Sequence, residues 1–326
     1  MKRLICGRWF FLYSCILFFG LSSTVSANGV HKRAAHGGQG HHSGGHHSGT
    51  EFTIEADYFN IGTSKSNIGN AQVDTSGVRI ETEYEINYTT FTLGLERWNY
   101  NWKNPGQLPF TSGVAVDPWT TFNTLQLGLE YEQEINEKWE IYYYVEAESS
   151  FEEETSNSNE YEVGIDFNFE QSKSWTYTLN INWEYLDAEG AEFGVDVEVE
   201  WNDHATEGWS GVFEISSEFP ESSLTYHFTP TISATVFYEE GGTNTIRLAN
   251  NSPVAGMQRG YMEDEYIGIG MRFSYSLGHD SFLAFSVQQN SEREMSFVDS
   301  TGNLNRTYQF GDSYEIGLRF AYQFAN

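Results

Sequence analysis

The stretch that decides the fold is Tyr314-Glu-Ile-Gly-Leu-Arg-Phe-Ala-Tyr-Gln-Phe324, near the end of the 326-residue chain. Apolar or aromatic side chains stand at every second position, and small or polar residues stand between them. Because side chains alternate between the two faces of a β-strand, one face of this segment is apolar and the other is polar. A strand of this length suits the closing strand of a β-barrel that spans a membrane.

The final aromatic residues of this stretch carry a family resemblance. Tyr322-x-Phe324, behind alternating apolar residues, resembles the C-terminal assembly signal of Gram-negative outer-membrane β-barrels. The family usually ends on the aromatic residue, whereas Ala325 and Asn326 follow it here. The resemblance is to porin-like barrels, with no subfamily identified. It implies contacts with outer-membrane lipid, with the barrel-assembly machinery and with periplasmic chaperones.

The N-terminal residues predict export. Lys2, Arg3 and Arg8 precede an apolar run from Trp9 to Leu21, and Val25-Ser26-Ala27 offers small residues for cleavage. This pattern is typical of a secretory signal peptide, which we assign to residues 1–27. Both cysteines of the chain, Cys6 and Cys15, lie within it, so the mature protein is expected to form no disulfide.

The charge balance excludes several classes of partner. The chain holds 17 basic and 46 acidic residues, and residues 1–27 contain three basic and no acidic ones, so the mature chain has 14 basic residues and a net charge of −32. Such acidity argues against binding to nucleic acid or to an anionic membrane surface. The mean hydropathy of −0.48 does not argue against a membrane barrel, because half of each barrel strand is polar.

Residues 28–50 form a low-complexity segment, which we predict to be a disordered tail. It contains six histidines among Gly, Ser, Gln and Ala: His31, His36, His41, His42, His46 and His47. Neutral imidazole is a common ligand of Zn, Cu and Ni, so weak binding of these metals is one interpretation. The alternative is a flexible leader of biased composition, and no other cofactor is predicted.

Residues 51–326 alternate with a period of two and predict an all-β, antiparallel, up-and-down transmembrane barrel of about fourteen strands. Twelve strands is the alternative if residues 209–238 hold one hairpin fewer. With a periplasmic N-terminus, the long connections fall on the outside and the short ones on the inside. The long connections are 61–77, 101–120, 149–159, 239–263 and 289–312.

Aromatic residues gather near the predicted strand ends, where membrane barrels carry two girdles at the lipid–water boundary. We therefore assign the following side chains to outward-facing girdles: Trp98, Trp102, Trp119, Trp139, Trp175, Trp201, Trp209, Tyr238, Tyr261 and Tyr266.

The opposite face of the predicted strands is rich in carboxylates, which would be too costly to bury unpaired in a dry core. A water-filled lumen would accommodate them, and rings of Asp and Glu attract cations. The candidate lumen-lining acidic residues are Glu55, Glu81, Glu83, Glu130, Glu146, Glu162, Asp166, Asp196 and Glu198, opposed by Arg79, Arg272 and Arg319. The alternative is that these carboxylates only keep the lumen hydrated and the exported chain soluble.

The sequence gives no catalytic arrangement, so we do not expect an enzyme. Beyond the tail the barrel has only His204, His227 and His279, and His279-Asp280-Ser281 in one turn cannot form a nucleophile–base geometry. Three functions stay open: a general or cation-preferring channel for small solutes, a solute-specific channel with metal ions as one option, and a non-conducting barrel for adhesion or envelope structure.

Overall fold

The structure is a computed structural model, and it describes residues 50–108, 110–111, 116–153, 157–187, 190–202, 205–215, 221–254, 256–278, 281–301 and 304–325. The predicted signal peptide and residues 28–49 of the predicted histidine-rich tail lie outside these residues. Among the described residues, the only helix is one 3₁₀ turn, η1 (Pro105–Gln107), and no helix is long and apolar enough to cross a membrane.

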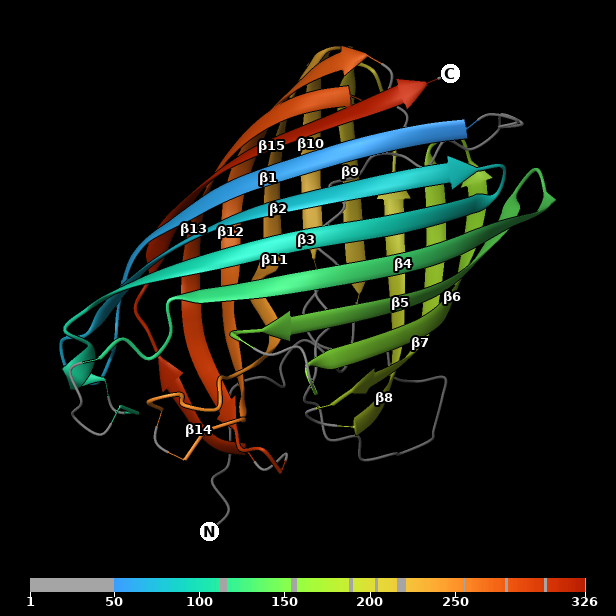
Figure 1. The fold of residues 1–326 in the computed structure, drawn as a ribbon. Coiled ribbons are helices and arrows are strands. Elements are labelled where there is room, and N and C mark those ends of the chain that lie inside the picture. Colours follow the sequence, from blue (N-terminus) through green and yellow to red (C-terminus); the bar gives the residue numbers. More distant parts are fainter. Residues whose placement is uncertain are drawn as a thin grey trace, which may run out of the picture. The chain divides into compact units, whose positions relative to one another are not determined.

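In the described part of the chain, fifteen strands form one sheet, which is antiparallel except for one parallel bridge between Phe151 and Arg247 and which closes on itself (Figure 1). They are β1 (Thr50–Lys65), β2 (Gln72–Ile86), β3 (Thr89–Lys103), β4 (Thr121–Asn136), β5 (Trp139–Phe151), β6 (Asn159–Ser172), β7 (Trp175–Leu186), β8 (Gly190–Trp201), β9 (Gly208–Ile215), β10 (Ser222–Thr229), β11 (Ile232–Arg247), β12 (Tyr261–Gly278), β13 (Ser281–Val298), β14 (Leu304–Gln309) and β15 (Ser313–Ala325).

Fourteen of these strands make the barrel wall. Each pairs with its neighbour in sequence from β1 to β13, β13 pairs with β15, and β15 pairs with β1 to close the ring. β14 pairs only with the last part of β13. The predicted fourteen-strand antiparallel barrel is therefore confirmed. Along the chain, short turns between consecutive strands alternate with connections that are mostly longer. The short turns lie at one end of the barrel, which we call the short-turn end, and the others lie at the opposite end, which we call the long-connection end.

The outer face of the wall is an apolar band. Along β3 and β4, Phe91, Leu93, Leu95, Leu127 and Leu129 point outward and are each more than two fifths exposed, and the outward residues of β15 are similar. The residues between them face the interior and are more buried. A continuous exposed apolar surface of this extent is unfavourable in water and is matched by lipid. The alternation read from Tyr314–Phe324 thus holds around the barrel.

Toward the long-connection end the same strands exchange their apolar and polar faces. On β3 the outward residues change from leucine to Arg97, Asn99 and Asn101, while the inward residues become Trp98 and Tyr100. β2, β12 and β13 change in the same way. Outward polar and inward apolar side chains are the pattern of a sheet surrounded by water. These strands therefore run beyond the apolar band, and there they enclose a hydrophobic core.

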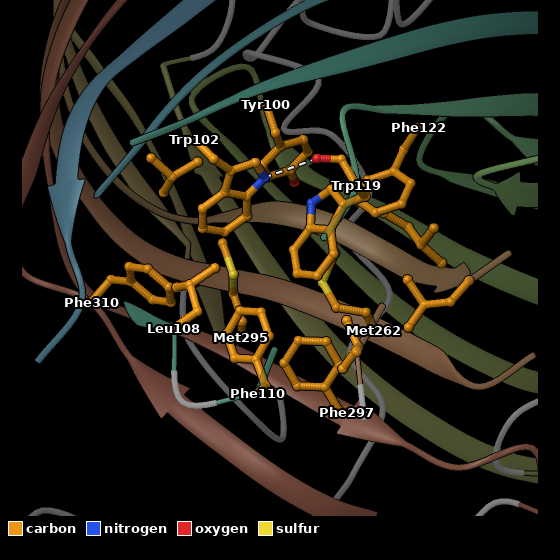
Figure 2. Packing of buried hydrophobic residues seen from close by; sticks show 14 of the residues in the cluster. Tyr100, Trp102, Leu108, Phe110, Trp119, Phe122, Met262, Met295, Phe297 and Phe310 are labelled. Carbon is orange, nitrogen blue, oxygen red and sulfur yellow. Dashed lines mark hydrogen bonds between the residues drawn. The ribbon is translucent and has the colours of Figure 1, made fainter. Parts of the chain in front are cut away.

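That core, which we call the aromatic plug, fills the inside of the barrel at the long-connection end (Figure 2). It consists of Ile61, Ala71, Val73, Trp98, Tyr100, Trp102, Leu108, Phe110, Trp119, Phe122, Ile246, Leu248, Val254, Met257, Met262, Tyr266, Met295, Phe297 and Phe310. Trp102 and Trp119 pack edge to face with ring centroids 5.2 Å apart, and the Trp102 indole N–H donates to the Trp119 carbonyl over 2.9 Å. Burial of so many large rings stabilises the plug strongly.

The plug corrects the predicted girdles. Trp98, Trp102, Trp119, Tyr261 and Tyr266 are all 6% exposed or less and do not contact lipid. The three tryptophans and Tyr266 belong to the plug itself. By contrast, Trp139, Trp175 and Trp209 at the short-turn end are exposed by about two fifths to one half, as a lipid-facing girdle requires.

A bulge in β13 brings part of the plug inward. The register with β12 shifts between Glu265 and Ile267, and Glu292 on β13 has a φ of 53°. An extra residue in one strand reverses the alternation beyond it. Inward residues are even-numbered up to Asn290 and odd-numbered from Arg293 onward. The strand therefore continues into the predicted connection 289–312, as far as Val298, with Met295 and Phe297 facing the core.

Candidate functional site: an acidic lumen closed at one end

The barrel interior contains a cavity of about 660 Å³. Its lining holds eighteen Asp or Glu side chains and three Arg side chains. All strands that contribute these acids present them by the same alternation that turns apolar residues to the outside. The cavity reaches from Glu51, Glu85 and Gln323 at the short-turn end to Phe59 and Trp98, where the aromatic plug begins.

The structure places most of the predicted lumen residues on this lining. The acidic ones are Glu55, Glu81, Glu83, Glu130, Glu146, Glu162, Asp166 and Glu198, and the basic ones are Arg79, Arg272 and Arg319. Asp196 is absent from the lining; it lies on β8 directly opposite Asn180 of β7. The role of these residues in selectivity stays a prediction.

The three arginines lie on one side of the barrel, on β2, β12 and β15. Arg79 donates to Glu81 over 2.5 Å and to Gln126 over 3.2 Å. Arg319 forms an ion pair with Glu55 and lies 3.6 Å from Asp57. Two of the three positive charges are paired with neighbouring carboxylates, but the carboxylates of the lining far outnumber the arginines, so the lining is predominantly acidic.

The opposite side, over β4 to β9, combines carboxylates with neutral hydrogen-bond donors. The Tyr144 hydroxyl donates to Glu162 Oε1 over 2.6 Å, and Asn182 Nδ2 donates to the same oxygen over 2.9 Å. Asn180 Nδ2 donates to the Tyr144 oxygen over 2.9 Å and also to Asp166. These neutral donors fix the orientation of the two carboxylates.

Carboxylates also face one another directly across neighbouring strands. Glu146 of β5 is in register with Glu162 of β6, Glu162 with Glu184 of β7, and Glu184 with Glu192 of β8. Directly opposed side chains in a sheet stand about 5 Å apart, and like charges at that separation destabilise the pairing. This row of four glutamates concentrates negative charge on one side of the interior.

The aromatic plug closes the cavity toward the long-connection end. The rings of Phe59 and Trp98 lie 4.5 Å apart between their centroids, and the Tyr266 hydroxyl donates to Glu315 over 3.0 Å. Phe59 packs against the plug, and Trp98 and Tyr266 belong to it; all three line the cavity. The boundary between plug and lumen is therefore a layer of aromatic rings facing carboxylates.

Within the plug lies a charged pair that the sequence analysis missed. Arg293 and Asp264 are wholly buried, and Arg293 also donates to Ser64 over 3.2 Å and to Thr75 over 3.0 Å. The Tyr100 hydroxyl donates to Asp264 over 3.0 Å. The sequence does contain a sign of this buried region, because the apolar and polar faces of β3, β12 and β13 exchange near the long-connection end. The predicted strands were too short to include these residues.

The remaining predicted sites have the following positions. The metal-binding histidines all lie outside the described residues, within which no group of three or more His, Cys, Asp or Glu side chains could hold a metal ion. Tyr322 and Phe324 lie on the outer face of β15, more than two fifths exposed, and Phe324 is in register with Phe52 of β1. His227 Nε2 lies 2.9 Å from Ser210 Oγ inside the barrel.

A closed antiparallel barrel with an apolar outer band and an acidic cavity has the architecture of a transmembrane β-barrel. The sequence resemblance drawn from Tyr322 and Phe324 implied the same class.

Comparison with known proteins adds a likeness of architecture only. The sequence matches no protein-family model and no curated protein. Among solved structures, the KdgM porin in complex with disordered oligogalacturonate has a TM-score of 0.35 and 11% identity, with 82% of this chain and 99% of that chain covered. The toluene transporter TodX of P. putida has a TM-score of 0.46, 7% identity, and 85% and 91% coverage. OprB of Pseudomonas putida has a TM-score of 0.40, 8% identity, and 85% and 94% coverage.

Proposed function

We propose that this protein is an outer-membrane channel for passive diffusion of small solutes, and that it prefers cations. The observation that carries this proposal is the lining of the cavity, where eighteen carboxyl side chains face three arginines. Residues 1–27 would direct export, and lipid would surround the apolar band. The short-turn end, where β1 begins, would face the periplasm.

The physical reason for cation preference is the excess of carboxylates over arginines among the residues that line the cavity. A passage bounded by low-dielectric walls focuses the field of its charges, so it concentrates counter-ions and repels ions of like charge. On β5 to β7, tyrosine and asparagine side chains donate hydrogen bonds to lining carboxylates, as Glu162 and Asp166 illustrate. Anions would therefore meet an unfavourable potential along most of the lumen.

The test is a bilayer recording of the purified mature protein under a KCl gradient. A reversal potential of the sign set by K⁺ is expected, and a sign set by Cl⁻ would reject cation preference. Changing Glu83, Glu130 and Glu146 to Gln together should reduce the selectivity, because all three line the cavity. Glu137→Gln, in an exposed turn between β4 and β5, is the matched control and should leave selectivity unchanged.

A second candidate function is a non-conducting barrel that serves adhesion or envelope structure. The aromatic plug favours it, because large rings such as Trp119, Phe110 and Phe297 fill the interior at one end and leave almost no exposed surface. The same recording separates the two candidates: a folded protein that inserts into the bilayer without any conductance would support this second function.

A third candidate is a channel for a particular solute, with metal ions as one option. The histidine-rich segment 28–50 would then collect Zn, Cu or Ni near the short-turn end. Conductance measured with and without residues 28–50, in the presence of each metal, tests this candidate. Equal conductance and equal metal block in both proteins would contradict it.

A further inference from the structure

Three aromatic rings and one carboxylate line the closed end of the cavity together. The rings are those of Phe59, Trp98 and Tyr266, and the carboxylate is that of Glu315. Phe59 and Trp98 have ring centroids 4.5 Å apart, and the Tyr266 hydroxyl donates to Glu315 over 3.0 Å. Phe59 is in register with Gly317, and Glu315 stands two residues from this glycine on the same face of β15. The four side chains therefore adjoin one another, and we call them the floor of the lumen.

Two of the floor rings lie against the barrel wall, because a glycine stands opposite each of them. Phe59 is in register with Gly77 of β2, and a Cβ atom added to this glycine would be 2.0 Å from the ring. Tyr266 is in register with Gly241 of β11, where an added Cβ atom would be 2.1 Å from the ring. A glycine within a strand leaves room for such a close approach. Each ring therefore covers the backbone of the neighbouring strand instead of reaching across the cavity.

Glu315 carries the negative charge of the floor, and neutral groups hold it in place. The Tyr266 hydroxyl donates to its Oε2 atom over 3.0 Å, Asn290 Nδ2 over 3.1 Å and Gln288 Nε2 over 3.3 Å. Because three donors converge on one oxygen, the carboxylate has a fixed position. A positive group that contacts the Tyr266 ring would therefore lie close to this charge.

Elsewhere in the barrel interior, two arginines already show how a cation lies on such a ring. The Arg272 guanidinium carbon is 5.0 Å from the centroid of the Phe237 ring, and this ring also lies over a glycine, Gly270, at 2.5 Å from an added Cβ atom. Arg319, which forms ion pairs with two carboxylates, lies 5.8 Å from the centroid of the Phe282 ring. A cation within about 6 Å of a ring centroid is attracted by the negative face of the ring. Rings and carboxylates thus act together on positive groups inside this barrel.

The composition of the floor matches an organic cation better than a metal ion. Aromatic rings do not supply the oxygen ligands that hard metal ions require, and no group of three or more His, Cys, Asp or Glu side chains in the described part of the chain is placed to hold a metal. Ring faces do recognise ammonium ions that carry carbon groups. The cavity of about 660 Å³ lies within the range of about 300–1,000 Å³ that small-molecule sites occupy.

We infer that the floor of the lumen binds a small organic ammonium ion, with its positive charge beside Glu315 and its carbon groups against the three rings. This inference names the class of cation that the acidic lumen takes up, so it rests on the proposed channel function and deepens it.

The experiment measures binding of tetramethylammonium chloride to the full mature protein in a neutral detergent, by ligand-detected NMR, with KCl as the competitor. Tetramethylammonium and K⁺ carry the same charge, so contacts with the rings are what should favour the first. We expect it to bind more tightly than K⁺ by about two- to fivefold for each ring that it contacts. Displacement by an equal concentration of K⁺ would overturn the inference.

Two variants test the floor residues themselves. Replacing Phe59 by trifluorophenylalanine keeps the shape of the ring but weakens its negative face, so tetramethylammonium should bind about two- to fivefold more weakly. The same replacement at Phe91, an exposed ring on the outer face of β3, is the matched control. Glu315→Gln should weaken binding by at least about fivefold, whereas Glu137→Gln in an exposed turn should not change it. Unchanged binding in either floor variant would overturn the inference.

A separate conductance measurement distinguishes failure of this inference from failure of the proposed function. A protein that binds tetramethylammonium as expected but does not conduct would reject the channel and keep the binding site. A cation-preferring channel that binds tetramethylammonium no better than K⁺ would keep the channel and reject the binding site.

Discussion

Arg293 and Asp264 form a two-pronged ion pair at the centre of the aromatic plug. Arg293 Nε donates to Asp264 Oδ1 over 2.9 Å and Nη2 donates to Oδ2 over 2.6 Å, and both side chains are 0% exposed. Tyr100, Ser64 and Thr75 complete their hydrogen bonds. The pair joins β12 to β13 beside the bulge at Glu292, which turns Arg293 inward. Its geometry thus depends on the irregularity of the strand.

The first prediction concerns this pair. Arg293→Met leaves a buried carboxylate without its cation, and loss of one partner from a buried pair costs about 3–5 kcal/mol. We expect the plug to loosen and to become sensitive to protease at the long-connection end. Limited proteolysis of the folded protein, followed by mass spectrometry of the fragments, measures this.

The double variant Arg293→Met with Asp264→Asn provides the control for the ion pair. It removes both charges, so its destabilisation should be smaller than the sum of the two single effects. Equal protease resistance in Arg293→Met and the wild type would show that the plug does not depend on the pair.

The second prediction concerns a close approach inside the lumen. A Cβ atom added at Gly164 would lie 2.3 Å from the Tyr144 ring and hydroxyl, which cover the glycine from the neighbouring strand. Gly164→Ala should therefore destabilise the barrel by about 1–3 kcal/mol, because the ring must move away and give up its hydrogen bond to Glu162. The midpoint of urea unfolding in detergent measures the effect.

Gly311→Ala is the matched control for this change, since its added Cβ would meet only the Lys65 carbonyl at 3.6 Å. If the two alanine variants unfold at the same urea concentration, the contact between Gly164 and Tyr144 is not a constraint on the fold. Adding Tyr144→Leu to Gly164→Ala should relieve the clash.

Most of the wall could be predicted from local alternation. Strand segments such as Leu125–Tyr131 and Trp175–Tyr185 have one apolar face throughout, and this pattern alone fixes which residues face lipid. The inward positions of Glu83, Glu146 and Glu162 follow from the same parity. The fourteen-strand count rested on the alternation of long and short connections, and the wall has that number.

The aromatic plug was beyond such reasoning for two physical reasons. Trp98 and Trp102 near a strand end satisfy the composition of a lipid-facing girdle, and only the polar residues outward of them, Arg97 and Asn101, distinguish a water-exposed sheet. In β13, the bulge at Glu292 reverses the parity, so counting residues from Phe282 assigns Met295 to the wrong face. Contacts between segments far apart in sequence, such as β5 with β11, leave no periodic signal.

The third prediction concerns the lumen arginines. Arg79→Gln removes a cation that lies 2.5 Å from Glu81 and leaves that carboxylate uncompensated. Cation preference should increase, which would move the reversal potential further toward that of K⁺. The control is Arg97→Gln, on the exposed outer face of β3, which should leave the reversal potential unchanged. A shift toward Cl⁻ in Arg79→Gln would contradict the electrostatic account.

The fourth prediction concerns closure of the barrel. Phe324 pairs in register with Phe52, with ring centroids 5.9 Å apart, and its ring packs edge-on against Tyr322 at 4.6 Å. Phe324→Ala should lower the amount of folded protein in the outer membrane, because closing strand and assembly signal are both weakened. Gel mobility without heating separates folded from unfolded barrels. The control is Tyr314→Ala at the other end of β15, whose side chain is 68% exposed; equal losses in both variants would contradict a special role for Phe324.

The last prediction concerns the junction between β5 and β11, at Glu152 just beyond the end of β5. Burial raises the pKa of this carboxyl group, and the hydrogen bond from the Ala249 N–H opposes the rise only in part. A raised pKa in the folded protein means that the neutral form fits the site better. The contribution to stability is therefore complete below the ordinary pKa of glutamate and is lost as the pH rises through the raised value. Protease should accordingly cut the junction more easily at a pH above the raised pKa than at the ordinary pKa of glutamate, after correction for the protease's own pH dependence on an unfolded substrate. Glu152→Gln keeps an acceptor for Ala249 and has no charge, so it should remove this dependence. A Gln variant that loosens with pH as the wild type does would assign the effect to another group.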